Sequence, residues 1–292
     1  MCLICDLRSG HTPAAPDAPD SHRWSSRRGF LLAAAAATAS VAAPPALGQV
    51  NVGAPSRMRR LVPADVLENA AAQQFTQMMR DAGRQGALLP DSDPQVQRLR
   101  AIARRLIPHA EPWNPRARGW QWQVQLIRSD QINAFCMPGG KIAFFTGILE
   151  QLKLDDDEAA MIMGHEMAHA LREHARSRLA KSTATDTGLR LGAALLGLGD
   201  LGNLAAGLGA QLLTLKYSRD DETEADLVGL ELAARGAYRP QASVSLWQKM
   251  ARAGGSGGPA FLSTHPSGPN RIRELEANVP KVQGLYEAAR RG

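Results

Sequence analysis

The sequence predicts an α+β protein that is mostly helical and contains one small β-sheet. Apolar residues recur with helical spacing over most of the chain, which indicates amphipathic helices packed around a core. A short alternating pattern near the middle of the chain indicates the strands. The residues after a predicted N-terminal signal, 49–292, have a suitable length for a single globular domain.

These patterns place the individual elements. Between residues 120 and 129, two tryptophans, Val124 and Leu126 alternate with glutamines, as in a half-buried strand. Residues 138–140, Pro-Gly-Gly, indicate a turn, and residues 141–146 form a second β-like run. Helical spacing predicts helices at residues 64–84, 94–107, 147–152, 156–181, 220–235, 241–253 and 269–277.

Segment 188–215 is rich in Leu, Ala and Gly and carries only Arg190 and Asp200 as charged residues. Residues 200–203 interrupt the apolar run near its middle, so we do not expect it to span a membrane. Two interpretations fit the pattern. The segment forms a pair of buried helices between its neighbours, or it forms a mobile apolar flap over a functional site.

Residues 1–48 are predicted to be a twin-arginine signal peptide with a disordered leader. Residues 26–31 match the export pattern S-R-R-x-F-L, and an Ala-rich apolar stretch follows as far as Ala43. Residues 46–48 form a small-x-small cleavage site, so we expect the mature chain to begin at Gln49. The sequence therefore predicts export to the periplasm, where the cleaved chain is soluble. The alternative is an uncleaved signal that remains as a membrane anchor.

The net charge indicates which partners the protein can bind, and the cysteines indicate whether it can form a disulfide. The chain has 34 Lys and Arg against 28 Asp and Glu, a formal net charge of +6 that is spread without a basic block, so we expect no nucleic-acid binding. Peripheral contact with an anionic membrane is compatible with this charge. Cys136 is the only cysteine after residue 48, which excludes an internal disulfide, and we expect it to be a small packed residue.

The most informative motif is H-E-M-A-H at residues 165–169. Positions four apart share a helix face, so His165 and His169 can hold one zinc ion, and Glu166 can reach a water molecule beside it. In segment 156–181, acidic residues begin the helix, apolar residues fill its first half and basic residues its second. We therefore expect a buried first half and an exposed second half. A buried polar motif needs a reason, and a metal ion provides one.

A catalytic zinc takes three protein ligands, so a third donor must come from elsewhere in the chain. The acidic start of predicted helix 220–235 offers Glu222 and Asp226, which are four apart and share a face. One carboxylate can bind zinc while the other accepts the N–H of a ligand histidine. An ordinary solvated first turn is the alternative.

These segments resemble the HtpX/BepA-like zinc metallopeptidases, family 48 of the metallopeptidases. The family's E-x-E-A-D motif matches residues 222–226, its N-A-F-x-x-P-G-G-x-I hairpin matches residues 133–142, and its T-H-P-x-x-x-x-R-I segment matches residues 264–272. With H-E-x-x-H, four motifs occur in the family's order over about residues 61–279. The resemblance implies a zincin-like domain with an active-site helix, a second helix that supplies a zinc ligand, and a small sheet.

The resemblance also implies roles for single residues. It makes Glu222 the third ligand of one Zn²⁺ per chain, beside His165 and His169. It places Asp226 behind the ligands, in hydrogen-bonding contact with them. Glu166 is then the catalytic base that takes a proton from the attacking water.

His265 and Arg271 follow a Gly-rich stretch and belong to the last of the four motifs. Either side chain can stabilise the oxyanion of the tetrahedral intermediate if the fold holds that side chain near the zinc. Both residues are therefore candidate catalytic residues. His265 can instead fill the open position on the zinc and hold the enzyme off. His109 and His174 receive no role, because we expect His174 to point away from the ligand face.

Substrate binding is expected at Gly140, Lys141, Ile142 and Ala143. An edge strand beside the zinc helix can pair with the main chain of an extended substrate, and this mode accepts many sequences. A plain structural hairpin is the alternative.

Together, these observations predict an exported zinc metalloendopeptidase, a hydrolase that cleaves misfolded or stalled cell-envelope proteins. Its expected partners are unfolded or misassembled substrates, with peripheral contact to the membrane or to outer-membrane assembly proteins. The alternative function is a periplasmic chaperone or assembly factor whose latent protease site is plugged by His265. An exopeptidase is a third option, which an open edge strand disfavours.

Overall fold

The structure is a computed structural model that describes residues 50–182, 212, 214–253, 259–266 and 268–292. All of them belong to one compact unit, Leu47–Gly292. The predicted signal peptide and almost all of segment 188–215 lie outside the described residues, so both remain predictions. Among the helices that the structure describes, none combines the length and the apolar character of a membrane span.

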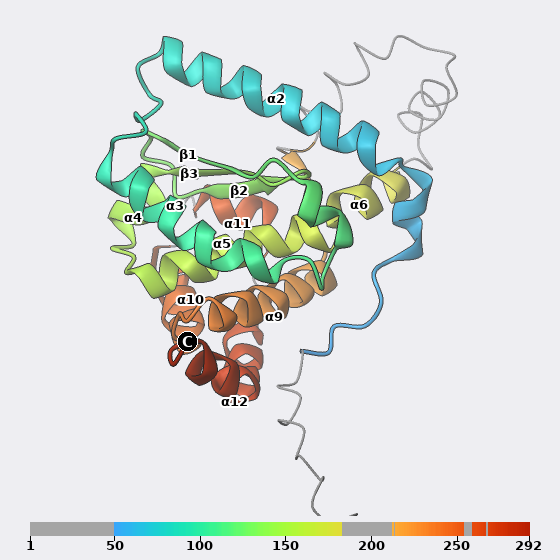
Figure 1. Cartoon of the computed structure of the whole chain (residues 1–292), viewed down its shortest axis with the longest axis vertical. Coiled ribbons are helices and arrows are strands. Elements are labelled where there is room, and N and C mark those ends of the chain that lie inside the picture. The colour runs from blue at the N-terminus through green and yellow to red at the C-terminus, as the bar shows by residue number, and fades with distance from the viewer. Residues whose placement is uncertain (1–49, 183–211, 213, 254–258, 267) are drawn as a thin grey trace, which may run out of the picture. The chain divides into compact units, whose positions relative to one another are not determined.

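A three-stranded sheet with strand order β1-β3-β2 forms the centre of the unit (Figure 1). The central strand β3 (Lys141–Phe145) pairs parallel with β1 (Gln123–Ile127) and antiparallel with β2 (Ala134–Met137). The predicted turn closes the β2–β3 hairpin, and Gly140 there has a φ of 76°. A Cβ on Gly140 would lie 2.6 Å from the ring of Trp122, so only glycine fits this turn.

Helices cover both faces of the sheet, as Figure 1 shows. α2 (Ala64–Arg84) lies across one face, where it packs on Ala143 of β3. α3 (Pro94–Leu106) and α5 (Asp156–Leu171) cover the other face, in the cluster that contains Phe144. Neighbouring β3 side chains therefore point to opposite layers, and the mostly helical α+β class is confirmed.

α9 (Arg219–Arg235) packs along α5 on the side away from the sheet. The two backbones approach each other closely at Gly164 and Gly229. A Cβ on Gly164 would lie 2.7 Å from the carbonyl oxygen of Gly229, and a Cβ on Gly229 would lie 2.6 Å from the backbone nitrogen of His165. Glycine at both positions permits this contact, which brings the two motif-bearing helices together.

The prediction of one helix over residues 156–181 is wrong, because the helix ends at Leu171. Glu173 adopts a left-handed conformation with a φ of 57°, and α6 (His174–Ser182) begins at the next residue. The Glu173 carboxylate is held by Arg59, at 2.7 Å, and by Arg176. Ion pairs, one of them to a distant part of the chain, thus stabilise a break that contains neither Gly nor Pro.

The second half of this segment is also less exposed than we expected. Ala175, Leu179 and Ala180 of α6 are buried in a small cluster with residues of α2. α6 also packs against the 3₁₀ helix η1 (Arg57–Leu61). Its basic residues therefore lie around a buried apolar stripe.

The other predicted helices lie close to their expected positions, except at the C-terminus. α12 (Arg271–Ala289) continues well past residue 277, with Pro280 inside it. Pro280 is exposed, so the backbone hydrogen bond that it lacks is on the side that faces water. The remaining elements are η2 (Ile107–His109), η3 (Pro115–Gly119), α4 (Thr146–Gln151), α10 (Ala242–Ala253) and α11 (Ala260–Thr264).

Candidate metal centre

Four buried side chains converge on one point between three helices. His165 and His169 come from α5, Glu222 from the first turn of α9, and His265 from the end of α11. One donor atom of each lies within 4.8 Å of the others. The structure thus brings together the three predicted zinc ligands and one of the two candidate oxyanion residues.

The separations between these donor atoms suit a single zinc ion. Nε2 of His165 lies 3.1 Å from Nε2 of His169 and 3.3 Å from Nδ1 of His265. Oxygens of Glu222 lie 3.4 Å from Nε2 of His165 and 3.4 Å from Nε2 of His169. A tetrahedral zinc with bonds of about 2.1 Å separates its ligand atoms by about 3.4 Å. The donor set and its spacing therefore fit zinc.

The carboxylates of the cluster favour positive charge on the neighbouring imidazole of His165. Burial alone would raise the pKa of Glu222, but hydrogen bonds from His165, His169 and His265 outweigh it and hold that pKa far below its usual value. Burial would lower the pKa of His165, yet Asp226 and Glu222 raise it to about 9. Burial lowers the pKa of His169 despite the neighbouring Glu222. An ionised carboxylate is thus enclosed among imidazoles.

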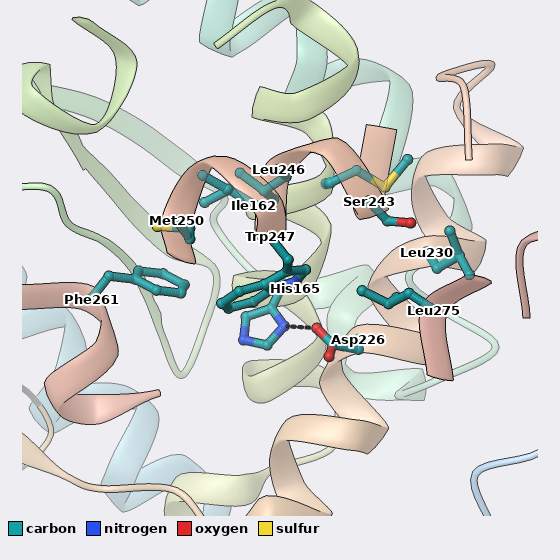
Figure 2. A pocket seen from close by; sticks show the side chains of 11 residues that line it. Ile162, His165, Asp226, Leu230, Ser243, Leu246, Trp247, Met250, Phe261 and Leu275 are labelled. Carbon is teal, nitrogen blue, oxygen red and sulfur yellow. Dashed lines mark hydrogen bonds and ion pairs between the residues drawn. The ribbon is translucent and has the colours of Figure 1, made fainter. Parts of the chain in front are cut away.

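Asp226 lies behind His165, where the resemblance places it. Its Oδ1 is 3.0 Å from Nδ1 of His165, as the dashed line in Figure 2 shows. Because Nε2 of His165 faces the other donors, Nδ1–H donates to Asp226 and fixes the tautomer that a metal requires. Figure 2 shows Trp247, Phe261 and Leu275 around this pair, in a small pocket with mostly apolar walls.

The structure corrects the expected role of Arg271. Its Nη1 donates to Glu222 at 3.0 Å, while Nη2 donates to Asp226 and Nε pairs with Asp226, both at 2.7 Å. Its guanidinium also lies 3.3 Å from the ring centroid of Trp247. Arg271 is therefore a buried clamp behind the ligands, because its two terminal nitrogens donate to the two carboxylates there.

Glu166 faces a cleft of about 210 Å³. Burial raises the pKa of its carboxyl group. Nearby histidines and the backbone amide of Cys136 lower this pKa, but by less than burial raises it. Its Oε1 is buried, has no hydrogen-bond partner among the residues that the structure describes, and lies 3.6 Å from Nε2 of His265. A buried carboxylate oxygen with unused acceptor capacity beside the donor set has the position that a general base needs.

The structure also corrects the predicted substrate strand. Ile142 and Ala143 belong to the central strand β3, whose main chain is paired on both sides, and Gly140 and Lys141 lie where the hairpin turn enters this strand. These four residues therefore offer no free edge. The strand that borders the cleft is β2, which pairs with β3 alone among the described strands.

The pairing pattern of β2 shows which of its groups are free. Phe145 N–H donates to the carbonyl of Asn133, and hydrogen-bonded pairs alternate along an antiparallel ladder. The main-chain groups of Ala134 and Cys136 therefore point away from β3, on the free side of the strand. Cys136 itself is buried, as expected for a packed residue.

Two aromatic residues beside His169 were not found by sequence reasoning. The ring of Tyr217 lies 3.9 Å from the ring of His169 at 31°. Nδ1 of His174 lies 3.0 Å from Nδ1 of His169. Five residues along a continuous helix amount to a rotation of about 140° away from His169, so only the break before α6 explains this contact. His109 lies elsewhere, near Arg235.

Fold and site together define a class, the zinc hydrolases in which one helix carries H-E-x-x-H and a second helix carries the acidic third ligand. Residues 94–279 match Peptidase family M48, and the chain belongs to that family of metallopeptidases. Zinc is the metal that this family uses, and the donor set described above fits it.

Several characterised proteins are similar to this chain. Mitochondrial metalloendopeptidase OMA1 of Schizosaccharomyces pombe is 34% identical over 78% of this chain and 65% of its own length. Human metalloendopeptidase OMA1 is 32% identical over 57% of this chain and 34% of its own length. The β-barrel assembly-enhancing protease of Yersinia pestis is 30% identical over 54% of this chain and 34% of its own length. The matched part of the chain thus covers between about a third and two thirds of the length of these relatives.

Proposed function

We propose that this protein is a zinc-dependent endopeptidase that cleaves unfolded or misassembled proteins of the cell envelope. The observation that carries the proposal is the buried Oε1 of Glu166, which has no hydrogen-bond partner among the described residues, lines a cleft and lies next to the donors of a metal site. The similarity to mitochondrial metalloendopeptidases supports the reaction, and the similarity to a β-barrel assembly-enhancing protease supports a substrate of the cell envelope.

The protein's own residues divide the catalytic work. When bound, zinc acidifies a water molecule to a pKa near 7 and polarises the scissile carbonyl. Glu166 takes the proton from the attacking water and passes it to the leaving amine nitrogen. Asp226 and Arg271 hold His165 and Glu222 in place from behind.

The cleft indicates the form of the substrate. Apolar side chains from separate parts of the chain line it, and the free side of β2 borders it. An extended chain can pair its main chain with Ala134 and with the carbonyl of Cys136, whose amide faces Glu166, and place apolar side chains in the cleft. Folded proteins bury such segments and unfolded ones expose them, which supports selection by folding state. The large apolar lining residues include Met78, Phe135, Met137, Phe145, Leu212 and Leu215.

Digestion of one protein in its folded and in its denatured state tests the proposal. We expect the zinc-loaded chain to cut the denatured form at internal bonds next to apolar residues and to spare the folded form, with fragments identified by mass spectrometry. Release of single residues from one end would instead show an exopeptidase and contradict the proposal.

We also propose that the protein acts in the periplasm after export. The S-R-R-x-F-L pattern and the small-x-small site at residues 46–48 support this location. N-terminal sequencing of the protein from a periplasmic fraction should begin at Gln49. Peripheral contact with the membrane or with outer-membrane assembly proteins belongs to the same proposal, and vesicle sedimentation tests the first of these contacts.

One observation favours a second function, that of an assembly factor with a latent protease site. Nδ1 of His265 lies 3.1 Å from Glu222, within the donor cluster, where it can occupy the position that water or substrate needs. His265→Ala should then increase cleavage of a denatured protein. A decrease would assign His265 to oxyanion stabilisation, and rescue of envelope assembly by Glu166→Gln would support the chaperone role.

A further inference from the structure

The break between α5 and α6 places a fourth histidine against the metal centre. His174 is buried, and its Nδ1 lies 3.0 Å from Nδ1 of His169. The other ring nitrogen of His174, Nε2, lies 3.3 Å from Oε2 of Glu224. His174 therefore bridges a predicted metal ligand and a carboxylate on α9.

Metal binding by His169 would determine which group donates and which accepts in the hydrogen bonds from His169 to His174 and from His174 to Glu224. Nε2 of His169 faces the other donors, so in the neutral ring the proton is on Nδ1, which must donate. Nδ1 of His174 then has to accept, which leaves its own proton on Nε2 for donation to Glu224. Each ring nitrogen of His169 and His174 thus has a single role as donor or acceptor. The carboxylate of Glu224, which can only accept, fixes the tautomers of both rings.

Glu224 is itself held in place. Nε of Arg172 donates to the same Oε2 at 2.8 Å, and Nη2 of Arg172 donates to the carbonyl of Gly53 at 2.9 Å. Arg172 is buried, whereas the side chain of Glu224 is partly exposed. This ion pair orients the carboxylate toward His174 rather than toward solvent.

We propose that His174 and Glu224 are positioning residues that fix the orientation and tautomer of His169, in the way that Asp226 does for His165. The inference rests on the metal centre proposed above. It gives a role to the middle carboxylate of the E-T-E-A-D motif and to a histidine that a continuous helix would have turned away. The two ligand histidines would then each be supported by a carboxylate of α9, one directly and one through an imidazole.

Zinc affinity, measured by competition with a chromophoric chelator, tests the inference. His174→Phe keeps the ring but removes both nitrogens, and we expect zinc binding to weaken by about 10- to 100-fold. His174→Asn can keep an acceptor near the position of Nδ1, so its affinity should remain within about threefold of the unmodified protein. Glu224→Ala, a change at a partly exposed residue, should also weaken zinc binding.

Controls separate orientation from general damage. His109→Phe, a matched change away from the site, should leave zinc affinity unchanged. The metal-free forms of His174→Phe and His174→Asn should have similar thermal midpoints, so that their difference in zinc affinity reports the orientation of His169. Absorption of the Co²⁺-loaded protein should change in His174→Phe and be restored in His174→Asn.

Two results would overturn the inference. One is equal zinc affinity in the unmodified protein, His174→Phe and Glu224→Ala. The other is equal loss in His174→Phe and His174→Asn, with a lowered midpoint in both. If the unmodified protein bound no zinc at all, the metal centre itself would fail, which is a different outcome.

Discussion

At the scale of single residues, the site contrasts two buried glutamates. Glu222 is surrounded by imidazoles and Arg271, which keep it ionised, whereas burial raises the pKa of Glu166. The first carboxylate therefore suits a metal ligand and the second a group that takes and returns a proton. The H-E-x-x-H and E-x-E-A-D patterns predicted that both residues lie at one site, and the structure brings them together there, while their roles stay predictions. The direction of Arg271 was not predictable, because it depends on how α12 packs against α9.

Replacement of the proposed base separates catalysis from metal binding. Glu166→Gln should retain zinc but reduce cleavage of a denatured protein by about 100- to 10,000-fold, because the amide cannot accept the proton. The matched control is Glu150→Gln on the surface of α4, which should cleave normally. Zinc content and initial cleavage rate are measured on the same samples. Undiminished cleavage by Glu166→Gln would overturn the mechanism.

Loss of the buried clamp should act mainly on stability. Arg271→Met leaves Glu222 and Asp226 without their cationic partner, and breaking a buried ion pair in this way costs about 3–5 kcal/mol. Urea unfolding of the metal-free protein measures the change. A variant with unchanged stability and a large loss in kcat alone would restore Arg271 to the oxyanion role.

At the scale of elements, the site depends on where helices begin, end and cross. Hydrophobic spacing predicted the bounds of α2, α3 and α9 well, because this signal is local in sequence. The break at Glu173 was not predictable, since it is stabilised by Arg59, which is 114 residues away along the chain. The expected edge position of residues 140–143 was wrong for a related reason, because alternation indicates a strand but not its neighbours.

The crossing of α5 and α9 can be tested at its closest contact. The Cβ of Gly229→Ala would overlap the backbone at His165, which should cost about 1–3 kcal/mol and weaken zinc binding as the helices separate. Gly83→Ala in α2 is the matched control, because its Cβ would meet no atom of the described residues within 4 Å. That control should be as stable as the unmodified protein, or more so. Equal stability of both variants would argue against the backbone contact.

The free side of β2 predicts a periodic requirement in the substrate. Residues of an added strand alternate between facing β2 and facing away from it. N-methylation of single amides along a cleavable peptide should therefore block cleavage at every second position near the cut site. Rates of the methylated series, determined by chromatography, give the pattern. Uniform effects at successive positions would contradict strand pairing.

At the scale of the whole molecule, the metal would connect three helices that are distant in sequence, α5, α9 and α11. A ligand that binds only the folded state stabilises it by mass action. Zinc at about 100 times its dissociation constant should add about 2.7 kcal/mol to the free energy of unfolding. Thermal midpoints at increasing zinc concentrations, with magnesium as control, test this coupling. A midpoint that does not respond to zinc would contradict it.

The most direct test of the account is anomalous scattering at the zinc edge from crystals of the protein grown with zinc. We predict one peak per chain, at about 2.0–2.2 Å from Nε2 of His165, Nε2 of His169 and an oxygen of Glu222. A peak bound elsewhere, or Glu222 turned away from a metal that the two histidines hold, would contradict the central claim.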